Sequence, residues 1–494
     1  MHLHKRAFPA LAVACAALWG APAAGAAEVI VIDGERAEVR HDPVSPGRSE
    51  TSLGRARGRG PSAQAAASPR GQRAVMRALR KARRAGKLSA ARQRRYRRAY
   101  LRARSVRRRL TGTRGRQLGY VISIVDRLAR RRRLTSSRLR STFLQLSRNT
   151  QFWRRHGVPG ADVKFRGSEL LYRYFTGHGL QIHPLANFVK ANKLHGACTK
   201  GTGSCSRRRL RRLLDELSKL AVRRHRRFVA WEYQFHFGGG SPPWMSGMAQ
   251  GTAIQALARG SQLLHRPRYL ATARKALRGF STRPPAGVKA RGPLGGRHYL
   301  QYSFDRRLFI FNAFTQSLIG LFDYAEIAGS SYARRLFELA EPELTREIPK
   351  SDLGDWTRYS WRGRESTPDY HELLREVAQS ACNRKFGRVY CTLARRYRGY
   401  QTDPPEIELT GPATASEDSG TRIRFSLSKL STVEVKVYKG SSLAFRRIAT
   451  FRRGNRSFGW TPKSPGTYTI RLGAKEQRTG KGLKGRDSGT VLVE

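Results

Sequence analysis

The sequence predicts a mainly α-helical protein, in which an α/α toroid is followed by a small Ig-like β-sandwich. Three observations support this fold class. Apolar residues recur at helical spacing throughout residues 116–400, and Gly, Pro and aromatic residues gather between the helical segments. From about residue 401 to 494, segments such as "TVEVKVYKG" and "GTYTIRLGAKE" alternate with a period of two. A plain helical bundle is the alternative arrangement of the helices.

The first residues carry the features of an export signal. "MHLHKR" is positively charged, "AFPALAVACAALWG" is apolar, and small residues suitable for cleavage lie near Ala26 and Ala27. The apolar run is too short to cross a bilayer. We therefore expect residues 1–27 to be a signal peptide, and Cys15 to leave with it rather than carry a lipid. The mature chain is then secreted or associated with the cell envelope, with no transmembrane segment.

Two segments lie between the signal and the toroid. Residues 28–72 are expected to be extended or flexible, because they begin with the alternating "EVIVIDGERAEVRHDP" and continue into a Gly-, Ser-, Pro- and Arg-rich stretch. Residues 73–115 have the spacing of two arginine-rich helices with a break at Gly86. These helices are either an arm that binds polyanions or an arginine-coated hairpin that packs on the next domain.

The charge of the chain indicates its partners. It has 97 Lys and Arg residues against 34 Asp and Glu residues, a formal charge of +63. Such an excess favours polyanions, either an acidic polysaccharide or another polyanion of the cell envelope. A general preference for arginine, as in organisms with GC-rich genomes, is the alternative. A specific nucleic-acid interface is not expected, because the basic residues form no recognition module.

After signal cleavage, four cysteines remain as two close pairs. In an exported chain, an even number of cysteines favours disulfides, here Cys198–Cys205 and Cys382–Cys391. The spacings do not suit a zinc site. We expect no metal and no organic cofactor.

Three uncharged or aromatic-rich blocks interrupt the basic helical region, at residues 242–257, 297–324 and 355–374. Aromatic rings stack on the faces of sugars, and the planar guanidinium group of arginine binds carboxylates through two hydrogen bonds. Together the blocks suit a sugar acid. Each block alone is weak evidence, because a tryptophan near the start of a helix usually belongs to the core.

Residues 242–398 resemble the C-terminal domain of D-glucuronyl C5-epimerases, and the chain looks like a secreted bacterial relative of them. The resemblance rests on "PWMSGMAQGTAIQALARGS", on "HYLQYSFDRRLFIFNAFTQSLIGLFDY" and, with a shorter spacer, on "RYSWRGR" followed by "PDYH". These enzymes convert glucuronate to iduronate in heparan-type (heparosan-like) chains. The resemblance does not cover the first 150 residues or the β-sandwich.

The resemblance implies roles for individual residues. Tyr302, Tyr359 and Tyr370 would be catalytic, since C5 epimerisation removes a proton α to a carboxylate and returns it on the opposite face. Nearby arginines would lower the pKa of such tyrosines. Substrate contacts are expected from Trp244, Gln250, Gln301, Asn312, Arg358, Arg362 and His371. For Gln250, packing of the inner helices is an equal alternative.

The sequence departs from the family at one catalytic position. The family's glutamate falls on Gln301, which cannot exchange a proton as a carboxylate does, and the neighbouring glutamate falls on Leu300. Three alternatives follow. Two tyrosines serve both faces of the sugar, or Asp305 or His298 replaces the glutamate, or the epimerase activity is lost. The predicted function is that of a uronosyl C5-epimerase-like protein. A polysaccharide lyase and a non-catalytic protein that binds acidic glycans or the cell envelope are the alternatives.

Overall fold

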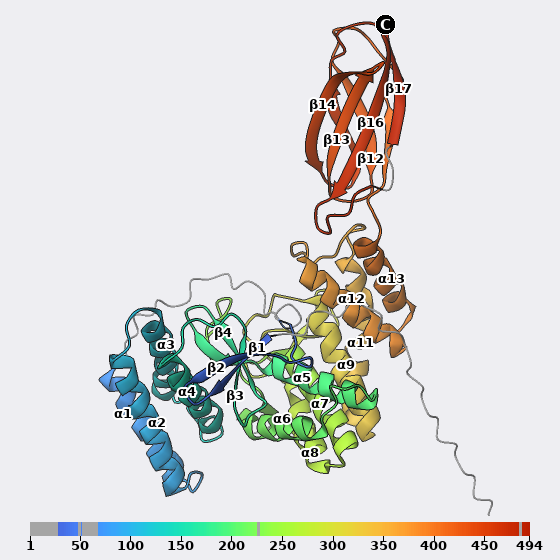
Figure 1. Ribbon diagram of the computed structural model, residues 1–494. Coiled ribbons are helices and arrows are strands. Elements are labelled where there is room, and N and C mark those ends of the chain that lie inside the picture. The colour runs from blue at the N-terminus through green and yellow to red at the C-terminus, as the bar shows by residue number, and fades with distance from the viewer. Residues whose placement is uncertain (1–27, 48–50, 52–67, 225–227, 484–486) are drawn as a thin grey trace, which may run out of the picture.

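The computed structural model describes residues 28–47, 51, 68–224, 228–483 and 487–494 (Figure 1). The expected signal peptide, Cys15 and most of the expected linker lie outside the described residues. The structure is 45% helix and 24% strand, so its composition is mixed rather than mainly helical. The toroid arrangement and the Ig-like type of the sandwich stay predictions.

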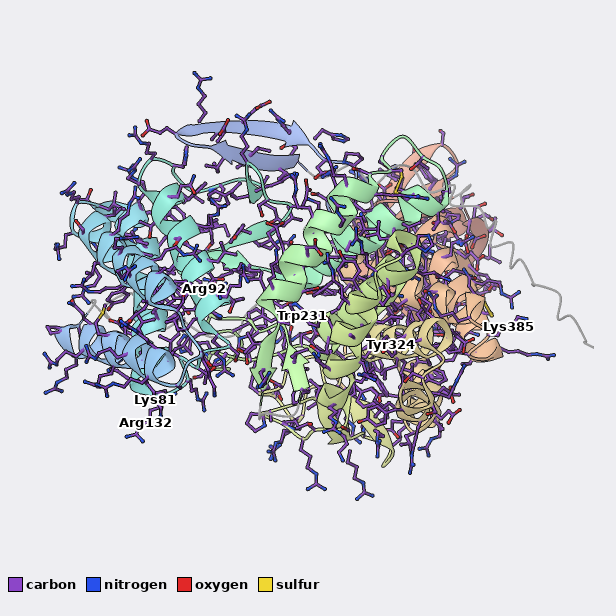
Figure 2. All side chains as sticks on the ribbon, turned by 90° about the horizontal axis from the view of Figure 1, so that it is seen from below. Lys81, Arg92, Arg132, Trp231, Tyr324 and Lys385 are labelled. Atoms are coloured by element: carbon purple, nitrogen blue, oxygen red, sulfur yellow. A yellow bond between two sulfur atoms is a disulfide. The ribbon has the colours of Figure 1, made fainter. Side chains whose placement is uncertain are left out.

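A strand hairpin and four helices come first in the chain: β1 (Glu28–Asp33), β2 (Arg36–His41), α1 (Pro69–Arg84), α2 (Ala90–Arg108), α3 (Gly112–Arg130) and α4 (Leu139–Trp153). The predicted break at Gly86 is confirmed, and its φ of +66° suits glycine. α1 packs on α3 and α2 on α4, while basic side chains such as Lys81 and Arg92 are exposed (Figure 2). The arginine-rich segment is therefore a packed helical hairpin with a basic outer surface.

The following strands correct the expectation of helix throughout residues 116–400: β3 (Asp162–Phe165), β4 (Leu171–Phe175), β5 (Gly179–Ile182), β6 (Val222–Arg224), β7 (Phe228–Ala230), β8 (Lys289–Arg291) and β9 (Arg297–Tyr299). One sheet has the order β2-β1-β3-β4-β5, in which β1 runs parallel to β3. The expected extended N-terminal segment is thus paired from residue 28 to 41. These strands are too short to show a clear period in the sequence.

The remaining helices, of which α7, α9 and α12 carry parts of the three blocks, are α5 (Pro184–Thr199), α6 (Arg207–Leu220), α7 (Gly247–Leu264), α8 (Pro267–Ala276), η1 (Leu277–Phe280), α9 (Phe311–Ala328), α10 (Ser331–Glu338), α11 (Glu341–Glu347), η2 (Ile348–Ser351), α12 (Pro368–Asn383) and α13 (Arg388–Thr402). α7 contacts both α5 and α9, and α9 contacts α12. These helices share one continuous hydrophobic core with the N-terminal helices.

The C-terminal strands make a β-sandwich with its own core: β10 (Ile407–Gly411), β11 (Thr414–Ala415), β12 (Thr421–Leu427), β13 (Ser431–Lys439), β14 (Ser442–Phe451), β15 (Gly454–Trp460), β16 (Gly466–Glu476) and β17 (Asp487–Val493). The sheets have the orders β10-β12-β15 and β11-β17-β16-β13-β14. Alternate residues of β13, including Val433 and Val435, are fully buried, which confirms the period of two. The sandwich stands beside α12 and α13 (Figure 1).

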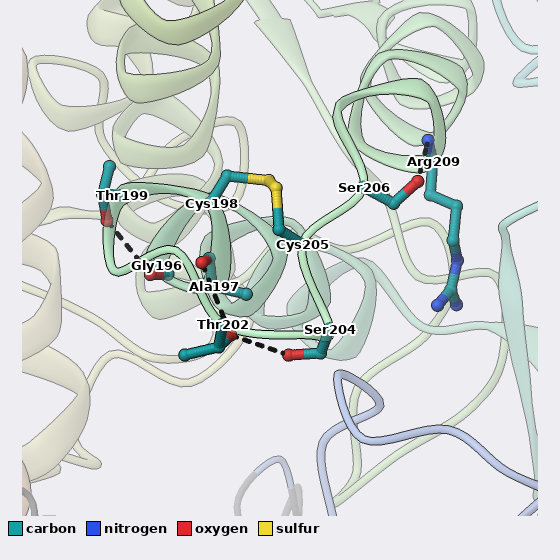
Figure 3. The surroundings of a disulfide bond; sticks show 9 residues. All are labelled: Gly196, Ala197, Cys198, Thr199, Thr202, Ser204, Cys205, Ser206 and Arg209. Carbon is teal, nitrogen blue, oxygen red and sulfur yellow. Dashed lines mark hydrogen bonds between the residues drawn. A yellow bond between two sulfur atoms is a disulfide. The ribbon is translucent and has the colours of Figure 1, made fainter.

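Both predicted disulfides are confirmed. Cys198–Cys205 closes the turn between α5 and α6 (Figure 3), and Cys382–Cys391 joins α12 to α13. Among the described residues, no helix is long and apolar enough to cross a membrane.

Candidate functional site

The glycines of the first two blocks allow α7 and α9 to cross at very short distance. A Cβ atom at Gly251 would lie 2.8 Å from the Cα of Ser317, and one at Gly320 would lie 2.2 Å from the carbonyl oxygen of Gly251. The start of α7 is capped by Ser246, whose Oγ accepts a hydrogen bond from the backbone N–H of Ala249 at 3.1 Å. The crossing fixes the start of α7 against the loop that precedes α9.

Trp244 and Gln250 do not have the sugar-facing positions expected for them, because both are buried. Trp244 stacks on Tyr233 with ring centroids 4.1 Å apart and donates its indole N–H to the carbonyl oxygen of Phe235. The side-chain amide of Gln250 donates to the carbonyl oxygens of Val229 and Ala276 at 2.9 and 3.0 Å. Their role is packing and backbone hydrogen bonding, the alternative considered for Gln250.

Gln301 and Tyr302 lie directly beside the capped start of α7. The Oγ of Ser246 donates to Oε1 of Gln301 at 3.0 Å. The ring of Tyr302 is only 3% exposed and packs against the rings of Phe237 and Phe304 at centroid distances of 5.4 and 5.3 Å. The second block therefore places a buried tyrosine next to a hydrogen-bonded glutamine.

Tyr359 lies on a tight hairpin, residues 358–365, which we call the Tyr359 hairpin. Its backbone N–H donates to the carbonyl oxygen of Arg364 at 3.0 Å. The hairpin is joined to the start of α9 by a bridge between Ile310 and Ser360 and by a hydrogen bond from Trp361 N–H to the carbonyl oxygen of Phe309. The second and third blocks are thus held together through backbone contacts.

The three predicted catalytic tyrosines meet in one group, the tyrosine cluster. The rings of Tyr359 and Tyr370 have centroids 4.6 Å apart. A hydrogen bond links the hydroxyls of Tyr359 and Tyr302. Tyr302 is buried, whereas Tyr359 and Tyr370 are partly exposed. The cluster therefore reaches from the core to the surface.

The electrostatics of the cluster differ from the prediction that arginines lower the tyrosine pKa values. Burial raises the pKa of Tyr302 far above its usual value, the charge of Tyr370 raises it further, and hydrogen bonds from Tyr359 and Gln301 lower it. Burial also raises the pKa of Tyr359, together with the neighbouring Tyr302 and Tyr370. Both phenols are therefore neutral at pH 7, because no arginine offsets the desolvation.

The remaining residues predicted to contact substrate divide into two groups. Arg362 is exposed at the tip of the Tyr359 hairpin, with a φ of 53°, and Arg358 is half-buried at its base. Asn312 is buried in the first turn of α9. His371 is fully buried and stacks on Trp356, so in this structure its ring contacts the protein interior rather than the surface.

His371 uses both ring nitrogens inside the protein. Its Nε2 donates to the carbonyl oxygen of Tyr397 at 2.9 Å, and its Nδ1 accepts from the Oγ1 of Thr357 at 2.9 Å. Burial lowers the pKa of His371 to about 4, so the imidazole is neutral at pH 7. It thereby holds Thr357, which directly precedes the Tyr359 hairpin.

The two residues considered as replacements for the family glutamate lie in other contacts. His298 is fully buried on β9, with its Nδ1 3.0 Å from Oε2 of Glu347. The carboxylate of Asp305 accepts a hydrogen bond from the backbone N–H of Arg307 at 3.0 Å. The structure therefore gives His298 a buried acidic partner and Asp305 a role in its own turn.

Residues 231–237 also belong to this region, although they lie outside the three blocks of the sequence. In "WEYQFHF", Trp231, Tyr233, Phe235 and Phe237 are buried, and three of them contact Trp244. The alternate residues face the N-terminal helices, since Glu232 pairs with Arg138 of that region. The period of two in this segment is the feature that predicts an extended wall behind Tyr302.

Residues 225–398 match the family model of the D-glucuronyl C5-epimerase C-terminus. All three members of the tyrosine cluster lie inside that range. A D-glucuronyl C5-epimerase of Caenorhabditis elegans is 30% identical over 133 residues, which are 24% of this chain and 22% of that protein. An uncharacterized protein of Methanocaldococcus jannaschii is 22% identical over 177 residues, 35% of this chain and 58% of that protein. The chain thus spans less than two thirds of either relative.

Similarity to solved structures is low. The CARDB domain of the PF1109 protein from Pyrococcus furiosus has a TM-score of 0.15 and 19% identity, and covers 18% of this chain and 91% of its own. The endo-beta-1,4-glucanase CMCax from Acetobacter xylinum has a TM-score of 0.31 and 10% identity, and covers 43% and 67%. Neither bears on the fold or the site.

Proposed function

We propose that this chain is a uronosyl C5-epimerase-like protein that acts on glucuronate, or a related uronate, in an acidic polysaccharide. One observation carries the proposal: Tyr302 of the second block meets Tyr359 and Tyr370 of the third block, with a hydrogen bond between Tyr302 and Tyr359 and a ring contact between Tyr359 and Tyr370. This group lies within the residues that match the epimerase family. The α/α toroid and the Ig-like sandwich are further parts of the proposal.

The chemistry needs a proton acceptor on one face of the sugar and a proton donor on the other. The C5–H bond breaks, its proton passes to a phenolate oxygen, and an enediolate forms on the carboxylate. A neutral phenol on the opposite face then transfers its proton to C5, which inverts the centre without consuming a co-reactant. Neutral phenols also donate hydrogen bonds to the enediolate as its charge develops.

The geometry supports a division of roles within the cluster. Tyr302 is buried and hydrogen-bonded to Tyr359, whereas Tyr359 and Tyr370 are partly exposed, although the hydroxyl of Tyr370 itself is buried. Arg358 and Arg362 lie on the same hairpin as Tyr359, and their guanidinium groups suit the uronate carboxylate. Asn312 and Gln301 complete the proposed site from the second block.

We place the proposed activity outside the cytoplasm. Both disulfides support this location, because such bonds persist in oxidising compartments. The excess of 97 basic over 34 acidic residues supports a polyanionic substrate.

Deuterium exchange at C5 tests the proposal. Uronate-containing polymers are incubated with the protein in deuterated water and examined by NMR. Tyr302→Phe and Tyr370→Phe each remove one hydroxyl and should lower the exchange rate by roughly 10²–10⁴-fold, the usual effect of a positioned acid or base. Tyr332→Phe is the matched control, because Tyr332 is exposed and bonds Ser281 instead. Full exchange in both cluster variants would refute the tyrosine assignment.

The two alternatives give different results in the same experiment. A polysaccharide lyase starts with the same proton abstraction but eliminates across C4–C5, so its unsaturated product absorbs in the ultraviolet. A binding protein gives neither exchange nor an unsaturated product with any uronate polymer, yet retains binding. Gln301 is the residue that favours the binding protein, because it lacks the exchangeable proton of a carboxylic acid.

A further inference from the structure

A cavity of about 350 Å³ lies outside the region that matches the epimerase family. It is bounded by β1, the end of β2, the β3–β4 turn and the first turns of α6, and we call it the α6 cleft. Its volume is in the range of cavities that bind small ligands. Six cationic side chains line it: Arg40, Lys164, Arg166, Arg208, Arg209 and Arg212.

The two carboxylates of the α6 cleft are already neutralised by cations. Asp42 receives a hydrogen bond from Arg209 at 2.6 Å and lies 3.4 Å from the Nζ of Lys190. Glu169 is 3.0 Å from the Nζ of both Lys164 and Lys190. Although burial opposes ionisation, Lys190 and Arg209 hold the pKa of Asp42 at about 2, so this carboxylate stays charged.

Two arginines of the cleft have no such compensation. Arg208 and Arg212 are exposed, one turn apart on α6, and neither has an acidic partner among the described residues. Among the described residues, Arg40 and Arg166 pair with the exposed carboxylates of Glu38 and Asp33. The cleft therefore carries a net positive charge that its own acidic residues do not balance.

The cleft is held in shape before any ligand binds. Cys205, bonded to Cys198 at the end of α5, directly precedes Ser206, whose Oγ accepts from the backbone N–H of Arg209 at 3.2 Å (Figure 3). The opposite wall is fixed by the pairing of β1 with β3. The first turn of α6 contains three arginines and no acidic residue, although cations are unfavourable at the positive end of a helix. A bound anion would relieve this repulsion.

We propose that the α6 cleft binds a carboxylate- or sulfate-bearing sugar unit of an acidic glycan, as an anchoring site separate from the tyrosine cluster. Arg208 and Arg212 supply guanidinium groups to the oxyanion, while Arg209 and Lys164 keep the cleft wall in place through Asp42 and Glu169. The proposal goes beyond C5 chemistry and holds whether or not the cluster turns over substrate.

A matched pair of double variants tests the site. Arg208→Ala with Arg212→Ala removes the two uncompensated arginines of the cleft. Arg207→Ala with Arg211→Ala removes the same charge from exposed residues of the same helix that do not line the cavity. The binding of fluorescently labelled glucuronate oligosaccharides, unsulfated and sulfated, is measured by anisotropy at fixed ionic strength.

The cleft variant should bind at least about tenfold more weakly than the native chain, since it loses two charge-assisted contacts. The control should weaken binding by no more than about threefold, because it lowers only the general attraction. A larger loss for the sulfated probe identifies sulfate as the preferred group, and a larger loss for the unsulfated probe identifies the carboxylate.

Equal losses of glycan binding in the two double variants would overturn the proposal. Binding of a labelled single-stranded DNA of equal charge is measured as well, and a cleft variant that weakens only DNA binding would also overturn it. If the alanine variant is unfolded by circular dichroism, Arg208→Gln with Arg212→Gln replaces it, and the same tenfold criterion applies. Tyr332→Phe, an exposed change outside both sites, should leave this binding within about twofold of native. Anisotropy reports binding, whereas deuterium exchange reports catalysis. Failure of the anchoring site is therefore separable from failure of the proposed catalysis.

Discussion

Arg478 of the sandwich should stabilise the Tyr359 hairpin from outside the helical region. Its guanidinium is 3.1 Å from Asp355 and 3.0 Å from Glu365, the residues that flank and end the hairpin. It also lies 5.1 Å from the centre of the Trp356 ring, which stacks on His371. A single residue of one domain thus holds the segment that carries a member of the tyrosine cluster.

Replacing Arg478 with Met should destabilise the protein by about 3 kcal/mol. The side chains of Arg478 and Asp355 are only 10% and 9% exposed, so the substitution leaves a buried carboxylate without its cation. Breaking a buried pair costs about 3–5 kcal/mol, and we take the lower end because Glu365 is 33% exposed and because Leu430 still donates its N–H to Asp355. Met keeps the length and the apolar packing of the arginine stem.

Urea unfolding and hydrogen exchange measure the two parts of this effect. The urea concentration at the unfolding midpoint should fall, and the backbone amides of residues 356–366 should exchange hydrogen faster than those of the rest of the helical region. Arg447→Met is the matched control, because it removes the same charge from an exposed arginine of β14. If the free energies of unfolding of Arg478→Met and Arg447→Met differ by less than about 0.5 kcal/mol, the usual range of surface substitutions, Arg478 does not stabilise the Tyr359 hairpin.

Gly320→Ala should lower the free energy of unfolding by about 1–3 kcal/mol, because it overpacks the crossing of α7 and α9. Gly196→Ala, in an open position of α5, should be neutral or stabilising, and equal melting temperatures of the two variants would disprove the close crossing. Replacing Cys198 and Cys205 with serine opens a loop with a sequence separation of 7 and should lower the free energy of urea unfolding by about 2–3 kcal/mol. An unchanged free energy of unfolding would show that the disulfide does not form. Burial lowers the pKa values of His371 and His178 to about 4. The unfolded chain, with a histidine pKa of about 6.5, therefore takes up protons first, so stability should fall from pH 6.5 to 4, and a flat profile there would contradict the buried neutral imidazoles.

The sequence predicted the parts of the fold that depend on local patterns. The helical hairpin with its break at Gly86, both disulfides and the alternation of β13 follow from short-range spacing, and all are confirmed. The resemblance also selected Tyr302, Tyr359 and Tyr370, which the structure brings together, although their catalytic roles stay predictions.

The parts that could not be predicted depend on contacts between distant segments. β1 pairs with β3, which no local pattern of either strand encodes. Trp244 and His371 have the residue types of a sugar site, but their burial is set by partners such as Tyr233 and Tyr397. The ion pairs of Arg478 with Asp355 and Glu365 could not be predicted from the sequence either, because one arginine among many carries no pattern.

Gln301 has a physical consequence for the choice of proton acceptor. The hydrogen bond from Gln301 lowers the pKa of Tyr302, against the opposing effects of burial and Tyr370. A glutamate at this position would add a second negative charge beside the phenolate and make its formation harder. Glutamine therefore favours Tyr302 as the proton acceptor, whereas glutamate would take that role itself.

The pH dependence of C5 exchange separates these two mechanisms. With Tyr302 as the acceptor, exchange by the native chain should rise with pH beyond neutrality, because the phenolate fraction grows toward a pKa above its usual value. In Gln301→Glu, exchange should be equal or faster at pH 7, and its rise should move to lower pH, since a carboxylate ionises there. If both proteins gave the same alkaline profile, Gln301 would not lie next to the proton acceptor. If only the variant exchanged deuterium, the native chain would be a uronate-binding relative whose acceptor has been lost.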